Sequence, residues 1–368
     1  MELSDPPRAG VTEPVLHVCF VTWRDLAHPS AGGSEVLVDH LLRGLQQRGH
    51  TVALVCGGPV GARPYPVSCA GGTYSQYLLA PLTVMRRHRR FDLVVDVENG
   101  VPFFAPLWRR RPVMCLVHHV HGPQWRMRFP ALFAAVGWFL ERRMMPWAYR
   151  RSLFLAVSPS TASALEHLGV AQDRIRTFAQ GIEVRECATP RRPQGEPVFV
   201  AIGRLVPHKG VERLLRAWSA VHAEIGGTFV IVGDGPQLDA LRAAAPDGVE
   251  VRGRVEEAEK WSLLERCWFL VHGAHHEGWG IAVMEAAATG RPTVAFDVAG
   301  VRDSVVHGVT GVLVADGDDR ELATQWLALA RDPDRCQALG AAALERARLH
   351  AWDDAIDRFV EVAHEAMR

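Results

Sequence analysis

Short apolar segments alternate with amphipathic helical segments along the whole chain, and this alternation limits the fold more than any other feature. In the first half, the apolar run Leu16–Trp23 is followed by a helical pattern over Ser34–Arg48, which Gly49 ends. The apolar runs contain few polar residues, as is typical of parallel strands that helices cover on both faces. Further strands of this kind are predicted at Thr51–Cys56, Leu93–Val97, Val113–His118 and Leu153–Val157.

A proline-rich break divides this pattern in two. The segment 189–196 has the composition of a linker, and the alternation starts again after it. Two consecutive β-α-β runs predict an α/β protein with two Rossmann-like, doubly wound domains, 1–188 and 197–351, facing each other across a cleft. Ligands of such sheets bind at the carboxyl ends of the strands, so the cleft is the expected site. The strands predicted in the second half are Val198–Ile202, Thr228–Val232, Val249–Arg252, Trp268–Val271 and Thr293–Phe296.

The composition narrows the classes of function and location. The 41 basic residues equal the 41 acidic ones, so the net charge gives no support to a nucleic-acid-binding protein. The seven cysteines show no C-x-x-C spacing, which suits a reducing, cytoplasmic compartment. Met1–Pro14 lacks the pattern of a signal peptide. The longest apolar run, Phe129–Leu140, is shorter than the roughly 20 residues that span a bilayer.

Two glutamates eight residues apart flank the start of a predicted helix. The helix covers Ile281–Thr289 and ends at Gly290, with Glu277 before it and Glu285 about one turn inside it. Backbone amides at a helix N-terminus lack intrahelical partners and bind phosphate well. The amides in this place belong to Gly278, Trp279, Gly280 and Ile281. A phosphate-linked ligand would then contact amides between two carboxylates; the alternative is a turn and a helix with two solvated glutamates.

A basic loop follows the first predicted strand of the second half. It carries Arg204 and Lys209, two cations that could neutralise a pyrophosphate, although it could also be a solvated loop. Lysine is rare here, since Lys209 and Lys260 are the only two in the chain. Lys260 lies in an acidic run and is expected to be an ordinary surface residue. In the first half, Gly32 and Gly33 form a second glycine turn before a predicted helix.

Three histidines, His118, His119 and His121, follow the strand predicted at 113–118. They could bind a metal, but neighbouring positions in an extended segment alternate in direction and no acidic partner is evident nearby. A hydrogen bond from one histidine to a sugar hydroxyl is the preferred interpretation. The segment Asp316–Asp318 could also hold a divalent metal, but its position before a helix favours a turn with an N-cap. No metal or other cofactor is expected.

The region 86–151 is locally basic. It contains 13 arginines against four acidic residues, with several aromatic residues between them. This pattern is typical of a helix that lies on a membrane surface. The favoured interpretation is a core helix whose arginines extend to the solvent at its edges.

Together, these motifs resemble those of the glycosyltransferase 4 family. Glu277-Gly278-Trp279-Gly280 with Glu285 is similar to the E-x7-E signature of its retaining, nucleotide-sugar-dependent members. Gly203-Arg204-Leu205 with Lys209-Gly210 resembles the pyrophosphate loop of the family, and Gly32-Gly33 resembles its N-terminal glycine turn. The resemblance follows the order of nearly the whole chain. It implies a GT-B fold whose last helix, 352–368, packs back on the first domain.

The resemblance also implies roles for individual residues. Arg204 and Lys209 would hold the donor diphosphate, Glu285 the ribose hydroxyls and Glu277 the donor sugar. Gly33 would approach the diphosphate from the first domain. His118, or alternatively His119, would lie beside the donor sugar. Val255 would lie beside the base.

The implied reaction is the metal-independent transfer of a hexose from a nucleotide diphosphate sugar, with retention. A glycan or a lipid-linked molecule would be the acceptor, and the region 86–151 could make peripheral contact with the inner face of the membrane. Two alternatives share the donor site: a GT-B sugar-nucleotide epimerase and a non-catalytic nucleotide-sugar-binding protein. The donor base, the sugar, the acceptor and the oligomeric state are left open.

Overall fold

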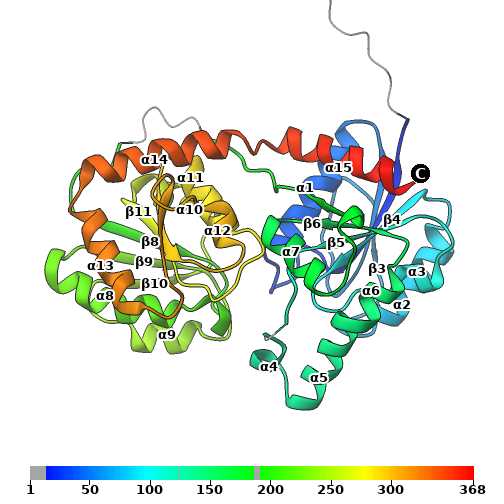
Figure 1. The fold of residues 1–368 in the computed structure, drawn as a ribbon, viewed down its shortest axis with the longest axis horizontal. Coiled ribbons are helices and arrows are strands. Elements are labelled where there is room, and N and C mark those ends of the chain that lie inside the picture. The colour runs from blue at the N-terminus through cyan, green and yellow to red at the C-terminus, as the bar shows by residue number, and fades with distance from the viewer. Residues whose placement is uncertain (1–13, 123, 186–190) are drawn as a thin grey trace, which may run out of the picture.

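The chain forms two parallel β-sheets, each covered by helices (Figure 1). The computed structural model describes residues 14–122, 124–185 and 191–368. Residues 1–13, for which no signal peptide was expected, and part of the predicted linker 189–196 therefore lie outside the described residues. The α/β class with two Rossmann-like domains is confirmed.

The first sheet has seven strands in the order β3-β2-β1-β4-β5-β6-β7. Its strands are β1 (His17–Arg24), β2 (Thr51–Gly57), β3 (Val67–Cys69), β4 (Leu93–Glu98), β5 (Val113–Val117), β6 (Leu153–Ala156) and β7 (Ile175–Thr177). Its α-helices are α1 (Gly33–Gln47), α2 (Gln76–Arg87), α3 (Ala105–Trp108), α4 (Gln124–Arg128), α5 (Ala131–Phe139), α6 (Met145–Ala148) and α7 (Pro159–His167). A π-helix, η1 (Leu140–Met144), and a 3₁₀-helix, η2 (Gln172–Arg174), complete the domain.

The second sheet has six strands in the order β10-β9-β8-β11-β12-β13. Its strands are β8 (Val198–Ile202), β9 (Thr228–Val232), β10 (Val249–Gly253), β11 (Phe269–His272), β12 (Thr293–Phe296) and β13 (Gly311–Val314). The helices that follow are η3 (Pro207–Lys209), α8 (Val211–Ile225), α9 (Leu238–Ala244), α10 (Glu257–Arg266), α11 (Ile281–Ala288), α12 (Val301–Ser304), α13 (Asp319–Ala330), α14 (Pro333–Arg348) and α15 (Trp352–Ala366).

Every strand predicted from an apolar run is present, with ends within one or two residues of the prediction. The central strands are buried on both faces, which explains why their sequences lack alternation. The edge strands β3, β7 and β13 were not predicted. β3 and β7 are each only three residues long and partly solvated, so neither carries a continuous apolar run. β13 is the four-residue segment Gly311–Val314.

The last helix, α15, packs on the first domain although it follows the second in sequence (Figure 1). The ring of Phe359 stacks on Phe20 of β1 at a centroid distance of 5.5 Å. Gly44 of α1 leaves room for the side chain of Ile356, which any larger residue at position 44 would displace. This helix therefore completes the core of the first domain, and the two domains are joined by two chain segments rather than one.

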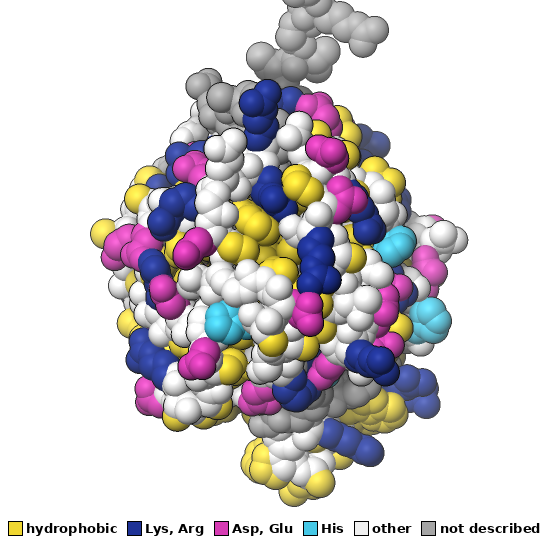
Figure 2. All heavy atoms as spheres, turned by 90° about the vertical axis from the view of Figure 1, so that its left-hand side faces the viewer, with side chains coloured by type: hydrophobic (Ala, Val, Ile, Leu, Met, Phe, Trp, Pro, Cys, Tyr) yellow, Lys and Arg dark blue, Asp and Glu magenta, His cyan; other side chains and the backbone are white. Residues whose placement is uncertain are grey.

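The helix α5 extends away from the body of the first domain (Figure 1). Leu132 and Phe133 are 74% and 67% exposed. The other exposed large apolar side chains here belong to Val136, Trp138, Phe139 and Trp147. For α5, the interpretation as a core helix is therefore wrong. Figure 2 shows apolar and basic side chains together at this lower end of the molecule.

We call residues 129–147 the arm. Its arginines include Arg142, whose guanidinium lies over the ring of Trp138 at 5.1 Å. Among the described residues, no helix is both long and apolar enough to cross a membrane.

The packing of α15 predicts the effect of Phe359→Ala. This substitution should lower the free energy of unfolding by about 3–5 kcal/mol, because it removes a fully buried ring and leaves a cavity beside Phe20. Urea denaturation followed by circular dichroism would measure the change. The exposed control Glu361→Ala should stay within about 0.5 kcal/mol of the wild type. An unchanged unfolding curve for Phe359→Ala would show that α15 adds nothing to this core.

Candidate active site

A cavity of about 410 Å³ lies where the two domains meet. Loops that follow β8, β9 and β10 line it from the second domain, and residues 29–31 line it from the first. Glycine is required in these loops, because a Cβ on Gly233 (φ 145°) would collide with the carbonyl group of Gly203. The cavity is at the carboxyl ends of the strands, as expected for doubly wound sheets.

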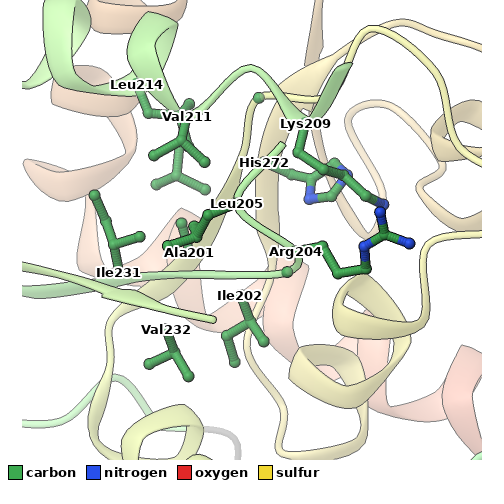
Figure 3. A pocket seen from close by; sticks show the side chains of 13 residues that line it. Ala201, Ile202, Arg204, Leu205, Lys209, Val211, Leu214, Ile231, Val232 and His272 are labelled. Atoms are coloured by element: carbon green, nitrogen blue, oxygen red, sulfur yellow. The ribbon is translucent and has the colours of Figure 1, made fainter. Parts of the chain in front are cut away.

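The loop after β8 carries the two predicted cations. Figure 3 shows Arg204 and Lys209 extending to one side of this loop, while Leu205 and Val211 lie on the other. Leu205 and Val211 are buried, so the loop is fastened to the core by its apolar side chains. Gly210, at φ 60°, approaches the backbone of residue 273 so closely that a side chain could not fit there. The basic loop is therefore held against the segment that leads to Glu277.

Glu277 forms a salt bridge with Lys209, and both side chains are largely buried. His272 Nε2 lies 3.2 Å from Glu277 Oε1. Burial alone would raise the pKa of Glu277, but the Lys209 ammonium and the neighbouring His272 outweigh it and lower the pKa below its usual range. Glu277 is therefore ionised at neutral pH and is a weak proton acceptor. Its environment suits a group that positions a ligand.

Glu285 forms a second salt bridge, with Lys260 Nζ at 2.6 Å. Lys260 lines the cavity and its side chain is only 15% exposed, so the expectation of an ordinary surface lysine is wrong. Burial raises the pKa of Glu285, and the charge of Lys260 opposes that shift. The rarity of lysine in this chain was the available sign that Lys260 has a special role. Its partner could not be identified from the sequence, because the pairing depends on the packing of α10 beside α11. Val255 lines the same cavity.

The helix α11 begins where the two domains meet. Its N-cap, Gly280, has φ 89°, a left-handed conformation that favours glycine. The side chain of Trp279 is buried beside His350, at a ring distance of 5.4 Å, so only its backbone is available to a ligand. The two predicted glutamates thus flank a helix N-terminus.

The first domain contacts this helix start through small residues. A Cβ on Gly33 would collide with the side chain of Ile281, and one on Gly278 would lie 2.5 Å from the carbonyl oxygen of His118. A Cβ on Gly32 would lie 3.3 Å from the side chain of Arg204. The structure therefore brings the glycine turn, the strand-end histidine and the E-x7-E segment together. The sequence predicted that these segments face each other across one cleft.

Two of the histidines after β5, His118 and His119, are neutral at neutral pH. Burial lowers the pKa of His118 to about 4. Burial also lowers the pKa of His119 well below its usual range, and the charges of neighbouring groups, Lys209 among them, add to this effect. The ring of His119 lies 5.6 Å from that of His276, which precedes Glu277. Both histidines are therefore close to the cleft, and either could contact a donor sugar.

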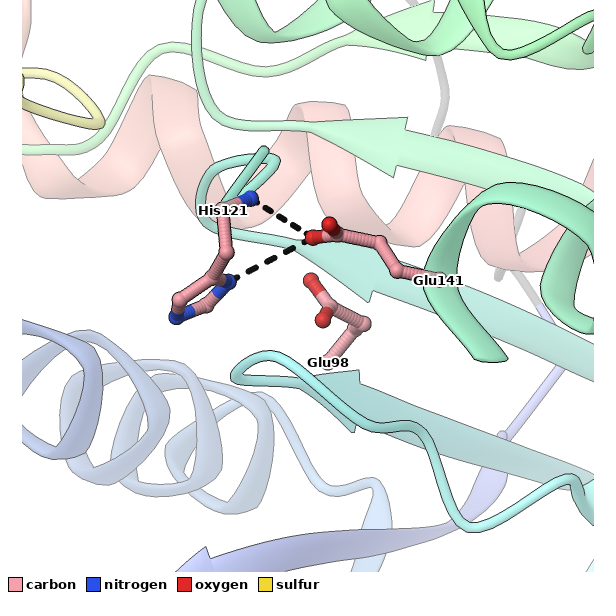
Figure 4. A group of neighbouring side chains, drawn as sticks. All are labelled: Glu98, His121 and Glu141. Carbon is pink, nitrogen blue, oxygen red and sulfur yellow. Dashed lines mark hydrogen bonds and ion pairs between the residues drawn. The ribbon is translucent and has the colours of Figure 1, made fainter. Parts of the chain in front are cut away.

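His121 has acidic neighbours that the sequence did not reveal. Glu98, at the end of β4, and Glu141, in η1, lie beside its ring (Figure 4). The expectation that no acidic partner lies near these histidines is therefore wrong. The three residues are separated by about 20 positions each, so no local spacing marks them as a group.

The segment Asp316–Asp318 is a turn with an N-cap, as predicted. Asp318 accepts a hydrogen bond from the amide of Glu321 at 2.8 Å. Asp316 is paired with Arg213 at 2.7 Å, so a guanidinium already neutralises this carboxylate.

Comparison with known proteins identifies the family of this chain. Residues 196–332 match the family described as "Glycosyl transferases group 1", and residues 31–186 match "Glycosyltransferase Family 4". The chain is 32% identical over 319 residues to a GDP-mannose-dependent alpha-(1-6)-phosphatidylinositol monomannoside mannosyltransferase of Mycolicibacterium smegmatis. That match covers 77% of this chain and 81% of the relative.

A D-inositol 3-phosphate glycosyltransferase of Thermobispora bispora is 33% identical to this chain. That match covers 49% of this chain and 46% of the relative. Among solved structures, Anabaena HepE in complex with UDP and glucose has a TM-score of 0.75 at 19% identity, over 95% of this chain and 99% of HepE. WaaG, a glycosyltransferase involved in lipopolysaccharide biosynthesis, has a TM-score of 0.75 at 14% identity, over 94% and 99% of the two chains. The chain therefore belongs to the group 1 glycosyltransferases of glycosyltransferase family 4, and it is a transferase with the GT-B fold.

Proposed function

We propose that this enzyme transfers a hexose from a nucleotide diphosphate sugar to a hydroxyl acceptor, with retention of the anomeric configuration. The observation that supports this most is the distribution of charge around the cavity. Arg204 and Lys209 lie on one loop, and the start of α11 lies between Glu277 and Glu285. This arrangement can hold a diphosphate in the middle and hydroxyl groups at both ends.

The leaving group of such a reaction is a diphosphate, on which negative charge develops. Arg204, Lys209 and the amides at the start of α11 would stabilise that charge, because they are already oriented before the reaction begins. With this positive charge in place, no metal is needed at the diphosphate. Glu277 would orient the donor sugar, and an oxygen of the leaving phosphate would accept the proton of the acceptor. Nuclear magnetic resonance of the product linkage would test the proposed retention.

Glu285 would accept hydrogen bonds from the ribose, with Lys260 nearby at the wall of the cavity. GDP-mannose is the first donor to test, because relatives of 32% and 33% identity are named GDP-mannose-dependent. UDP sugars are the second, because the solved HepE complexes contain UDP and UDP-glucose.

The arm supports a lipid-linked acceptor at a membrane surface. It combines exposed apolar side chains with arginines, which is the composition of helices that lie in a lipid interface. The name of the Mycolicibacterium relative also includes a phosphatidylinositol acceptor.

Replacement of the diphosphate-loop arginine tests the catalytic proposal. Arg204→Ala should lower the transfer rate by a factor of about 100 or more, because one oriented donor to the leaving group is lost. The rate would be measured as nucleotide release with GDP-mannose and UDP sugars in short assays that contain EDTA. Arg216→Ala is the matched control, since Arg216 is exposed and pairs with Asp319 away from the cavity. Near-normal turnover of Arg204→Ala, or a need for added Mg²⁺ or Mn²⁺, would contradict the proposal.

The two carboxylate partners of Lys260 provide a second test. Glu285→Ala should weaken binding of the free nucleoside diphosphate about tenfold or more, because a hydrogen bond to a charged group is lost. Glu257 also lies 2.6 Å from Lys260, but its side chain is 69% exposed. Glu257→Ala should therefore leave the affinity nearly unchanged. Titration calorimetry would compare the two, and equal affinities would remove Glu285 from the nucleotide site.

Binding to vesicles tests the role of the arm. The wild type should sediment with phosphatidylglycerol vesicles at low salt, and Leu132→Ser with Phe133→Ser should weaken binding about tenfold or more, because apolar area is lost. Leu349→Ser is the control, since Leu349 is equally exposed (77%) on the other domain. A wild type that stays in the supernatant would argue against membrane contact.

A further inference from the structure

Three buried side chains from separate elements converge in the first domain. Glu98 ends β4, His121 lies in the loop after β5, and Glu141 lies in the π-helix η1. They are 0%, 4% and 1% exposed, and one nitrogen or oxygen atom from each lies within 4.8 Å of the others. Figure 4 shows both carboxyl groups and the imidazole directed toward the same space. π-helical turns are often found at functional sites.

The cluster has unused bonding capacity. Glu98 Oε2 makes no hydrogen bond although it is buried, and the only polar contact of the buried His121 Nδ1 within the cluster is its pairing with Glu141 Oε1. Among the side chains that the structure describes, no lysine or arginine forms a salt bridge with either carboxylate. Buried carboxylates without a cation are costly, and those found in proteins are generally paired or bound to a metal.

Backbone groups already hold both carboxylates in place. Glu98 accepts a hydrogen bond from the amide of Gly100 through its other oxygen. Glu141 accepts from the amides of His121 at 2.6 Å and Gly122 at 3.1 Å, and from the indole of Trp125 at 3.0 Å. Such contacts orient the ligands of metal sites. His121 Nδ1 lies 3.4 Å from Glu141 Oε1. This agrees with the separation of about 3.3 Å expected for two ligands of a tetrahedral ion with bonds of about 2.0–2.1 Å.

We propose that Glu98, His121 and Glu141 bind a divalent transition-metal ion of the zinc class. One imidazole nitrogen with two carboxylates suits Zn²⁺, whereas Mg²⁺ and Ca²⁺ prefer sites made of oxygen alone. A dipositive ion also cancels the two buried negative charges. All three residues belong to the first domain, whereas the diphosphate loop belongs to the second.

The ion would fix the loop that carries the cleft histidines. The ring of His121 lies 4.2 Å from that of His119, which in turn faces His276 in the second domain. A ligand bond at His121 would hold this stack beside Glu277. The metal would thus act as a structural and positioning ion, and loss of it should loosen the 118–122 loop.

The test uses the full chain without a histidine tag. After prolonged dialysis against a chelator, the protein would be titrated with Co²⁺, whose visible absorption reports tetrahedral nitrogen and oxygen ligands. One Co²⁺ per chain, displaced by one Zn²⁺, with a rise in melting temperature, is the expected result. A protein that binds neither ion, or binds several weakly without a visible spectrum, would overturn the proposal and leave a protonated carboxyl pair as the state of the cluster.

Two variants separate this site from surface histidines. Glu98→Gln keeps the shape of the side chain but removes its charge, and should weaken Co²⁺ binding about 10–100-fold or more. His167→Asn, an exposed histidine of the same domain, should bind like the wild type. If Glu98→Gln did not fold, the Co²⁺ spectrum of the wild type would still decide the question. Equal binding by Glu98→Gln and wild type would overturn the assignment.

The outcome is independent of the proposed transfer reaction. Metal binding is measured without a donor, and nucleotide binding is measured by calorimetry on its own. Because the three ligand side chains are buried, EDTA present during a short transfer assay is not expected to remove the ion. A chain that binds Co²⁺ but transfers no sugar would contradict the function alone, and a chain that transfers sugar but binds no ion would contradict the metal site alone.

Discussion

Two largely buried salt bridges lie beside the cleft of this enzyme. The chain has only two lysines, and they pair with the two glutamates of the E-x7-E segment, Lys209 with Glu277 and Lys260 with Glu285. Each pair joins a different loop or helix to the start of α11. Removal of one partner would leave a buried charge alone, which is strongly unfavourable. The salt bridge with Lys209 therefore keeps Glu277 ionised, and both salt bridges hold their carboxylates in place before any ligand arrives.

The same pairs limit the chemistry that is open to the glutamates. An ionised Glu277 beside an ammonium neither donates a proton nor accepts one readily, so the two carboxylates do not form the acid and base pair of a glycoside hydrolase. The neutral His118 and His119 also add no positive charge at neutral pH. Stabilisation of a diphosphate leaving group is left to the cations of the basic loop and to the helix start, which agrees with the proposed mechanism.

The contact between the domains depends on glycines, which have no side chain. Gly33 and Gly278 lie where any Cβ would collide with the opposite domain. Because glycine has no Cβ, the glycine turn and the E-x7-E segment can each bring their backbone into contact with that domain. The helix α15 ties the end of the chain to the first domain. Together these features bring ligand-binding groups from both domains to one cavity, which neither sheet could form alone.

The sequence by itself determined the class of fold and nearly all of the strands, because burial on both faces produces continuous apolar runs. It also marked the residues of the proposed donor site, because glycines and charges lie at strand ends. Only the tertiary structure decided which partners meet. Lys260 and Glu285 are 25 residues apart, and Glu98, His121 and Glu141 span more than 40 positions. The exposure of the arm was likewise decided by packing. Such contacts depend on how separate helices and strands pack, and no local pattern of residues encodes that arrangement.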